Sequence, residues 1–193
     1  MKRIEHKKRM WFRRVSLAVA SAAAVVCLIL GSVSYIRYID RQQITYLEAS
    51  TSYGERKEIR LPDGTQLILN SCSRVCYPDR FADKERRVEL EGEGYFRVYH
   101  NEKQPFIVNT RHFDVRVLGT CFNVKSYSSD EVVSVDVESG KVQVDLPEAM
   151  MRLRAKEQIL INTVSGEYNK RYEERAVAVW RLSLIHISEP TRH

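Results

Sequence analysis

The chain has 193 residues, which allows one domain of ordinary size with an appendage and leaves little room for two. Hydrophobic residues make up 44% and charged residues 29%, values that are typical of globular proteins and argue against disorder. The formal net charge is +6, but from Gln42 to His193 there are 22 basic and 23 acidic side chains. The folded part is therefore nearly neutral, and we expect no nucleic acid among its partners.

The excess positive charge lies at the N-terminus. Residues 1–14 form a basic segment, and the 22 residues of 15–36 follow it without a charge. A helix of this length reaches about 33 Å, which is enough to cross a hydrocarbon core of roughly 30 Å. We therefore expect an uncleaved transmembrane helix at 15–36. The basic side chains that would hold the N-terminus in the cytoplasm are Lys7, Lys8, Arg9, Arg13 and Arg14.

This topology predicts a single-pass protein of the inner (cytoplasmic) membrane, with most of the chain in the periplasm. The alternative is a cleaved signal peptide, because the small-x-small pattern Ser32-Val33-Ser34 would allow cleavage before Tyr35. The apolar region of a signal peptide normally runs to about 7–15 residues, which favours the anchor. The five Ala and four Ser of the span suit either close packing against another helix or easy unwinding inside the membrane.

We interpret 37–54 as a linker and 55–182 as the folded domain. Through the domain, apolar and polar residues alternate with period two, and turn signals recur about every eight to twelve residues. This pattern predicts a mainly β fold, either an antiparallel β-sandwich or a stacked-hairpin, solenoid-like domain. Helical periodicity is detectable only near Glu173–Arg181.

Glycines mark the turns and bends of this domain. Asp63-Gly64 separates two short alternating segments, and since glycine accepts positive φ at little cost, this pair predicts a tight hairpin. Gly92 and Gly94 lie between two apolar stretches, where they allow a bend or a close approach of strands.

A second hairpin is predicted around the turn at Gly140. The alternation on its two sides places Val135 and Val144 in the core and leaves Asp136 and Gln143 exposed.

No catalytic motif is present: the chain has no nucleophile elbow, no phosphate-binding glycine loop and no zinc-binding helix. Glu91 and Glu93 lie two residues apart on one face of a strand. Such a pair can carry out acid–base chemistry, but carboxylates on an exposed strand face are far more often solvated surface residues, so the signal for catalysis is weak. Cys72 and Cys76 can pair only if the strand between them bends, and otherwise they and Cys121 are unpaired. We expect no enzyme activity, no metal and no cofactor.

Six segments between Thr51 and Trp180 have a characteristic order and spacing. The residues that mark them are Pro62, Asp63, Gly64, Tyr77, Pro78, Phe81, Glu91, Gly92, Phe96, Pro105, Phe106, Gly119, Thr120, Phe122, Asn123, Val124, Gly140 and Trp180. Together they resemble the FecR-like family of membrane-bound anti-sigma factors, particularly its Bacteroidetes branch. Most of these residues suit turns, bends or the core, so they are interpreted as structural and no catalytic residue is carried over.

The resemblance implies a transmembrane signalling regulator. In such proteins a periplasmic sensor meets the signalling domain of a TonB-dependent outer-membrane transporter, and the cytoplasmic segment holds an extracytoplasmic-function sigma factor. An intramembrane protease commonly releases that segment. The alternative is a membrane-anchored periplasmic β-domain that acts as an envelope binding or scaffolding module.

The chain departs from the family pattern at both ends. The resemblance implies a cytoplasmic region of several dozen residues, whereas 14 residues precede the expected span, and it implies a second α/β subdomain after the position of Trp180. We therefore expect the sequence given to lack most of that cytoplasmic segment and that subdomain. We expect 183–193 to be a tail foreign to the fold, because Pro190 would break a continuing helix and the last residues offer little apolar surface. The alternative is one short strand that includes Leu184, Ile185 and Ile187.

Overall fold

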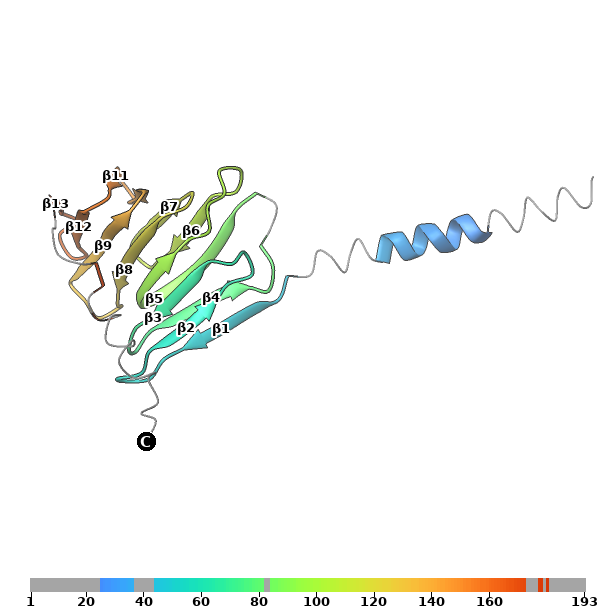
Figure 1. The fold of residues 1–193 in the computed structure, drawn as a ribbon, viewed down its shortest axis with the longest axis horizontal. Coiled ribbons are helices and arrows are strands. Elements are labelled where there is room, and N and C mark those ends of the chain that lie inside the picture. The colour runs from blue at the N-terminus through green and yellow to red at the C-terminus, as the bar shows by residue number, and fades with distance from the viewer. Residues whose placement is uncertain (1–24, 37–43, 82–83, 173–176, 179, 181–193) are drawn as a thin grey trace, which may run out of the picture. The chain divides into compact units, whose positions relative to one another are not determined.

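The computed structural model describes residues 25–36, 44–81, 84–172, 177–178 and 180 (Figure 1). It divides into two compact units, Met1–Ile44 and Thr45–His193. The expected tail at 183–193 and most of the predicted helical stretch near Glu173–Arg181 lie outside the described residues.

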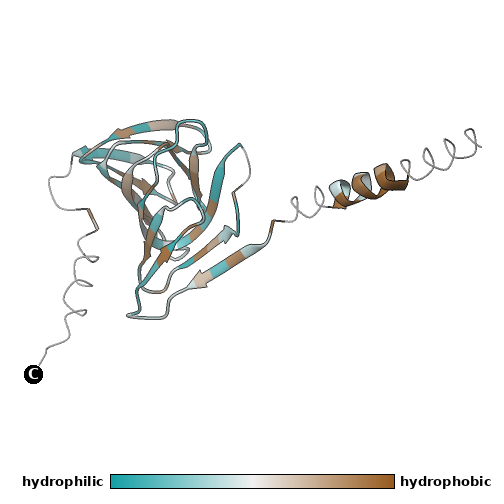
Figure 2. Cartoon of the chain, turned by 45° about the vertical axis from the view of Figure 1, so that its right-hand side comes forward, coloured by the Kyte–Doolittle hydropathy of each residue, from teal (hydrophilic) through white to brown (hydrophobic). Residues whose placement is uncertain are grey.

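The described part of the first unit is a helix at 25–36. Its apolar side chains are exposed, and the colours of Figure 2 mark most of this helix as hydrophobic. The other residues of the expected span, 15–24, and the basic segment 1–14 lie outside the described residues. Within the ranges that are described, no helix is long and apolar enough to cross a membrane. The transmembrane helix at 15–36 therefore stays a prediction.

The second unit confirms the mainly β prediction. Its strands are β1 (Tyr46–Ser50), β2 (Lys57–Arg60), β3 (Gln66–Leu69), β4 (Arg74–Pro78), β5 (Arg86–Arg97), β6 (Phe106–Asn109), β7 (Asp114–Val117), β8 (Cys121–Ser126), β9 (Val132–Ser139), β10 (Lys141–Asp145), β11 (Met150–Arg154), β12 (Glu157–Asn162) and β13 (Tyr168–Tyr172).

These strands form two sheets that share β5. The first sheet has the order β1-β4-β5-β6-β7-β10-β11, and the second has the order β2-β3-β5-β8-β9-β12-β13. Up to Glu91, β5 pairs with β4 and β6, and from Gly92 onward it pairs with β8 and β3. Figure 1 shows the strands of both sheets curling around a common interior. Of the two expected forms, this is a curled β-sandwich.

The core is one continuous cluster to which both sheets contribute. Val75, Val88 and Val115 come from the first sheet, and Leu67 and Phe122 come from the second, all at 1% exposure or less. Brown and teal residues alternate along many strands in Figure 2, as period-two patterning requires. The apolar alternation in the sequence therefore identified the buried face correctly.

Gly92 is the point at which β5 leaves one sheet and joins the other. Its φ is +104°, and a Cβ added there would lie 2.4 Å from Ser73 Oγ and 2.8 Å from Ser73 Cα. The same Ser73 Oγ accepts a hydrogen bond of 2.9 Å from the main-chain N–H of Glu93. The expected bend is thus present, but as a continuous strand of 12 residues rather than as two strands.

The predicted hairpins differ in outcome. The Asp63-Gly64 hairpin between β2 and β3 is confirmed by their antiparallel pairing. A hairpin at Gly140 is wrong, because β9 lies in the second sheet and β10 in the first, so this turn is a corner between sheets. The alternation of apolar and polar residues cannot distinguish a hairpin from a corner between sheets, because both arrangements place apolar residues on the inner face.

Burial around that corner follows the prediction on one face only. Val135 and Val144 are fully buried, as expected. Asp136 and Gln143 are half-buried rather than exposed, because β9 and β10 each have neighbours on both sides. Asp136 accepts a hydrogen bond from Gln158 of β12, which shields it further.

Two other features depart from the sequence interpretation. β1 lies within the expected linker at 37–54. Only Ala49 of that strand is buried, so its sequence does not show the period-two alternation of apolar and polar residues that predicted the other strands. The pair β5–β6 is parallel, in a fold expected to be antiparallel. The chain leaves the end of β5 in the second sheet and returns through 98–105 to the beginning of β5 in the first, which makes β6 run parallel to it.

A buried ion pair ties the Asp63 turn to β5. Arg86 is 1% exposed, and its Nη1 donates to Asp63 Oδ2 at 2.7 Å and to the Tyr99 carbonyl at 2.8 Å. Its Nε donates to the Gln104 carbonyl at 2.9 Å, and the guanidinium lies 5.5 Å from the ring centre of Phe106. These acceptors come from two loops, the turn between β2 and β3 and the 98–105 connection between β5 and β6, so Arg86 ties the two loops together.

We predict that Gly92→Ala destabilises the β-domain by about 3 kcal/mol, because it adds a steric clash to the cost of positive φ. Gly54→Ala is the matched control, since Gly54 has φ +76° but open space around its Cβ position, and it should cost about 1–2 kcal/mol. Chemical denaturation followed by circular dichroism measures both. Equal losses would show that the contact with Ser73 contributes nothing.

We also predict that Arg86→Met costs about 3–5 kcal/mol, because it leaves Asp63 buried without its cation. Arg87→Met should cost less than about 1 kcal/mol, since the side chains of Arg87, Glu85 and Asp114 keep 41%, 38% and 32% of their surface in water, which screens both ion pairs. The same denaturation experiment compares the two neighbours. A loss for Arg86→Met as small as for Arg87→Met would contradict the structural role of the buried pair.

Candidate functional site

Most of the family-marking residues lie in turns, close contacts or the core. Phe96 and Phe122 stack at 5.3 Å between ring centres, and Phe81 meets Phe106 edge-on at 6.0 Å. Val124 is fully buried, Pro78 ends β4, and Tyr77 packs against the core from outside. The Pro105 carbonyl accepts the main-chain N–H of Arg86 at 2.8 Å. Pro62 stands beside Asp63 and Gly64 in the turn already described.

Three of these residues, Gly119, Thr120 and Gly140, lie at the corner between the sheets. A Cβ on Gly119 would lie 2.7 Å from His100 Cα, and a Cβ on Gly140 would lie 2.8 Å from Thr120 Oγ1. Thr120 Oγ1 donates to the Lys141 carbonyl at 2.9 Å, just beyond the turn. These contacts require glycine at both places and fix where the chain changes sheet.

Asn123 and Trp180 meet on the second sheet, around a carboxylate. Glu93 accepts hydrogen bonds from Asn70 Nδ2 at 2.7 Å, from Asn123 Nδ2 at 2.8 Å and from Trp180 Nε1 at 2.9 Å. The Arg56 guanidinium lies 5.6 Å from the centre of the Trp180 ring. We call Asn70, Glu93, Asn123 and Trp180 the Glu93 cluster.

The Glu93 cluster is an attachment point rather than an acid–base site. Both oxygens of Glu93 accept hydrogen bonds, and the donors come from the residue after β3, from β8 and from the chain beyond β13. It therefore holds residue 180 against the second sheet. The sequence had paired Glu93 with Glu91 because of their spacing, but the two carboxylates have different partners.

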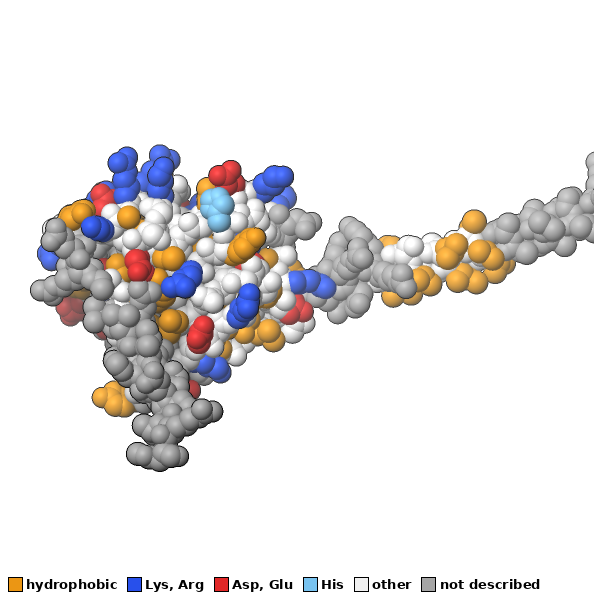
Figure 3. Space-filling view, viewed as in Figure 1, with side chains coloured by type: hydrophobic (Ala, Val, Ile, Leu, Met, Phe, Trp, Pro, Cys, Tyr) orange, Lys and Arg blue, Asp and Glu red, His pale blue; other side chains and the backbone are white. Residues whose placement is uncertain are grey.

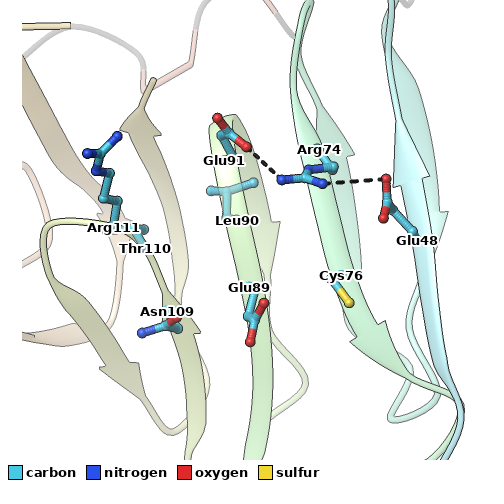
Figure 4. Close-up of a pocket in the computed structure, with 9 residues that line it drawn as sticks. All are labelled: Glu48, Arg74, Cys76, Glu89, Leu90, Glu91, Asn109, Thr110 and Arg111. Atoms are coloured by element: carbon cyan, nitrogen blue, oxygen red, sulfur yellow. Dashed lines mark hydrogen bonds and ion pairs between the residues drawn. The ribbon is translucent and has the colours of Figure 1, made fainter. Parts of the chain in front are cut away.

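Glu91 lines a groove on the outer face of the first sheet (Figure 4). The groove has a volume of about 350 Å³ and crosses β1, β4, β5 and the turn after β6. We call it the polar groove, and its lining consists of Glu48, Arg74, Cys76, Glu89, Leu90, Glu91, Asn109, Thr110 and Arg111. None of its residues except Glu91 was singled out from the sequence as a site residue, because they are brought together only by strand pairing.

Charges of both signs follow one another along the polar groove. Arg74 lies between two carboxylates, 2.9 Å from Glu91 and 3.9 Å from Glu48. The hydrogen bond from Arg74 lowers the pKa of Glu91, and a hydrogen bond from Ser128 lowers it further. Burial raises the pKa of the Cys76 thiol, so this cysteine is not an activated nucleophile.

The remaining chemistry is sparse. Cys27, Cys72, Cys76 and Cys121 are all free thiols. Within the part of the chain that the structure describes, no group of three or more His, Cys, Asp or Glu is placed to hold a metal ion. On the face shown in Figure 3, basic and acidic side chains are interspersed.

Comparison with known proteins relates this fold to one family. Residues 48–143, from β1 to β10, match the family described as FecR protein. Two crystal structures of proposed anti-sigma factors from Parabacteroides distasonis ATCC 8503 are similar to the chain. The structure at 2.50 Å resolution has 48% identity and a TM-score of 0.66, covering 67% of this chain and 61% of its own. The structure at 1.65 Å has 49% identity and a TM-score of 0.65, covering 66% and 60%.

No curated protein matches the chain significantly. The family match and the identity of nearly one half to the two solved structures agree with the order of motifs in the sequence. Residues 48–143 of the chain therefore form a domain of the FecR family. The chain spans about three fifths of the length of the two solved chains that it matches.

We predict that Glu93→Gln releases Trp180 from the second sheet, because an amide cannot accept all three hydrogen bonds and presents its own N–H groups to donors. In a Trp11→Phe background Trp180 is the only tryptophan, so its emission should shift to longer wavelength as the ring meets water. Glu91→Gln is the matched control and should leave the emission unchanged. An unshifted spectrum for Glu93→Gln would contradict the attachment.

Proposed function

We propose that this chain is a transmembrane signalling regulator of the anti-sigma type. The observation that carries the proposal is the identity of 48–49% to proposed anti-sigma factors over the β-domain. The residues that mark the family lie in turns, in the core, at the corner between the sheets or in the Glu93 cluster. They therefore build a scaffold, which suits a domain that binds partners.

In the proposed arrangement the β-domain lies in the periplasm and the uncharged segment at 15–36 spans the inner membrane. The apolar side chains exposed on the helix at 25–36 support this location, because such side chains are stable in contact with lipid. The partner on the periplasmic side would be the signalling domain of a TonB-dependent transporter. On the cytoplasmic side the partner would be an extracytoplasmic-function sigma factor, released through an intramembrane protease.

The transcriptional role is tested by deleting the gene in the source organism and restoring it as the full reading frame. We expect the deletion to change transcripts of a small set of operons, and the wild-type gene to restore them. Gly92→Ala should restore them less completely than Gly54→Ala, because it costs the domain more stability and so lowers the amount of folded protein. Identical transcripts with and without the gene would contradict an anti-sigma role and leave the scaffolding alternative.

The location is tested separately by fusing alkaline phosphatase after Trp180. This enzyme folds only outside the cytoplasm, so we expect an active fusion that stays with the membrane fraction. An inactive fusion would contradict the periplasmic location, and an active soluble product that begins near Tyr35 would show a cleaved signal peptide.

A further inference from the structure

The polar groove continues into a second cavity at the point where β5 changes partners. On one side β5 pairs with β6 up to Glu89 and with β8 from Gly92, so Leu90 and Glu91 have no strand partner on that side. A cavity of about 270 Å³ opens there, lined by Leu90, Glu91, Arg111, Ser126 and Ser128. It shares Leu90, Glu91 and Arg111 with the polar groove, so the two form one continuous depression.

Several groups in this depression lack partners. Ser126 is 3% exposed, lines the smaller cavity, and its Oγ has no hydrogen-bond partner among the described residues. Arg111 and Glu89 are exposed, and among the described residues neither side chain makes a hydrogen bond or a close ion pair. The charge of Arg111 acts on Glu91 and helps to lower the pKa of that carboxyl. A buried hydroxyl without a partner costs free energy, so a ligand that supplies one would be stabilised.

The charge pattern selects the kind of ligand. Glu48 and Glu89 stand on β1 and β5, whereas Arg111 stands beyond the end of β6 with Ser126 and Ser128 near it. A polymer of one charge sign, such as nucleic acid or an anionic lipid surface, would be repelled along part of this path. A ligand with an acidic group at one end and a basic group at the other is complementary to it.

The dimensions fit an extended chain. From β1 across β4 and β5 to β6 there are three inter-strand spacings, or roughly 14 Å. An extended peptide rises about 3.3 Å per residue, so about four or five residues cover this distance.

We propose that this depression is a binding site for a short extended peptide segment of a partner protein. An acidic side chain of the peptide contacts Arg111 and the hydroxyl of Ser126, and a basic side chain contacts Glu89 and Glu48. The site is independent of the proposed anti-sigma role, because peptide binding is measured without a sigma factor.

The test uses the full chain in neutral detergent micelles and fluorescein-labelled pentapeptides, with binding followed by fluorescence polarisation. The probes are Lys-Thr-Val-Thr-Glu and Glu-Thr-Val-Thr-Lys, which carry both charges in either direction, together with Lys-Thr-Val-Thr-Lys and Glu-Thr-Val-Thr-Glu. We expect at least one mixed-charge peptide to bind about fivefold more tightly than either single-sign peptide.

Charge reversal then tests the two ends. Arg111→Glu should shift the preference to the basic peptide, Glu89→Lys should shift it to the acidic one, and Arg111→Gln should abolish the preference for mixed charge. Arg152→Glu and Glu58→Lys are matched controls, exposed residues outside the depression, and should keep the wild-type order. No preference in the wild type, or equal behaviour of groove and control variants, would overturn the proposal.

Discussion

The passage of β5 through Gly92 is the constraint on which the rest of the domain depends. A strand can belong to two facing sheets only if it turns sharply between them, and φ of +104° at Gly92 supplies that turn. Ser73 fills the space where a side chain would be and accepts the next main-chain N–H. Because β5 pairs with β4 and β6 on one side of this point and with β3 and β8 on the other, it joins the two sheets of the core.

The candidate surfaces follow from the same strand. Glu89, Glu91 and Glu93 project every second residue from the outer face of β5, yet each has a different environment. Glu89 lies in the polar groove without a partner in the described part of the chain, Glu91 pairs with Arg74, and Glu93 holds Trp180. The neighbouring strands change between these positions, so three equal side chains acquire three roles.

Local patterns in the sequence predicted the mainly β fold, the buried face of its strands and the hairpin at Gly64. They failed where the answer depends on which strands become neighbours. The turn at Gly140 has the composition of a hairpin but connects two sheets, and β1 was hidden because an edge strand buries only Ala49. Arg86 was not predicted to be buried, since its acceptors at Asp63, Tyr99 and Gln104 are distant in sequence.

The candidate site was less predictable than the fold for the same reason. Trp180 and Asn123 stood out in the sequence, but nothing indicated that Glu93 would join them. The polar groove is assembled from four separate segments, and the unpartnered hydroxyl of Ser126 is visible only once β8 is placed beside β5. Period-two patterning gives the face of a residue and says nothing about its cross-strand neighbours.

Amide hydrogen exchange, resolved by residue, tests most directly whether β5 makes the two sheets one cooperative unit. We predict that amides of β6 in the first sheet and β8 in the second open with the same free energy, equal to that of global unfolding, and that denaturant changes both alike. Exchange of either sheet through an independent opening of lower free energy, while the other stays protected, would contradict this account.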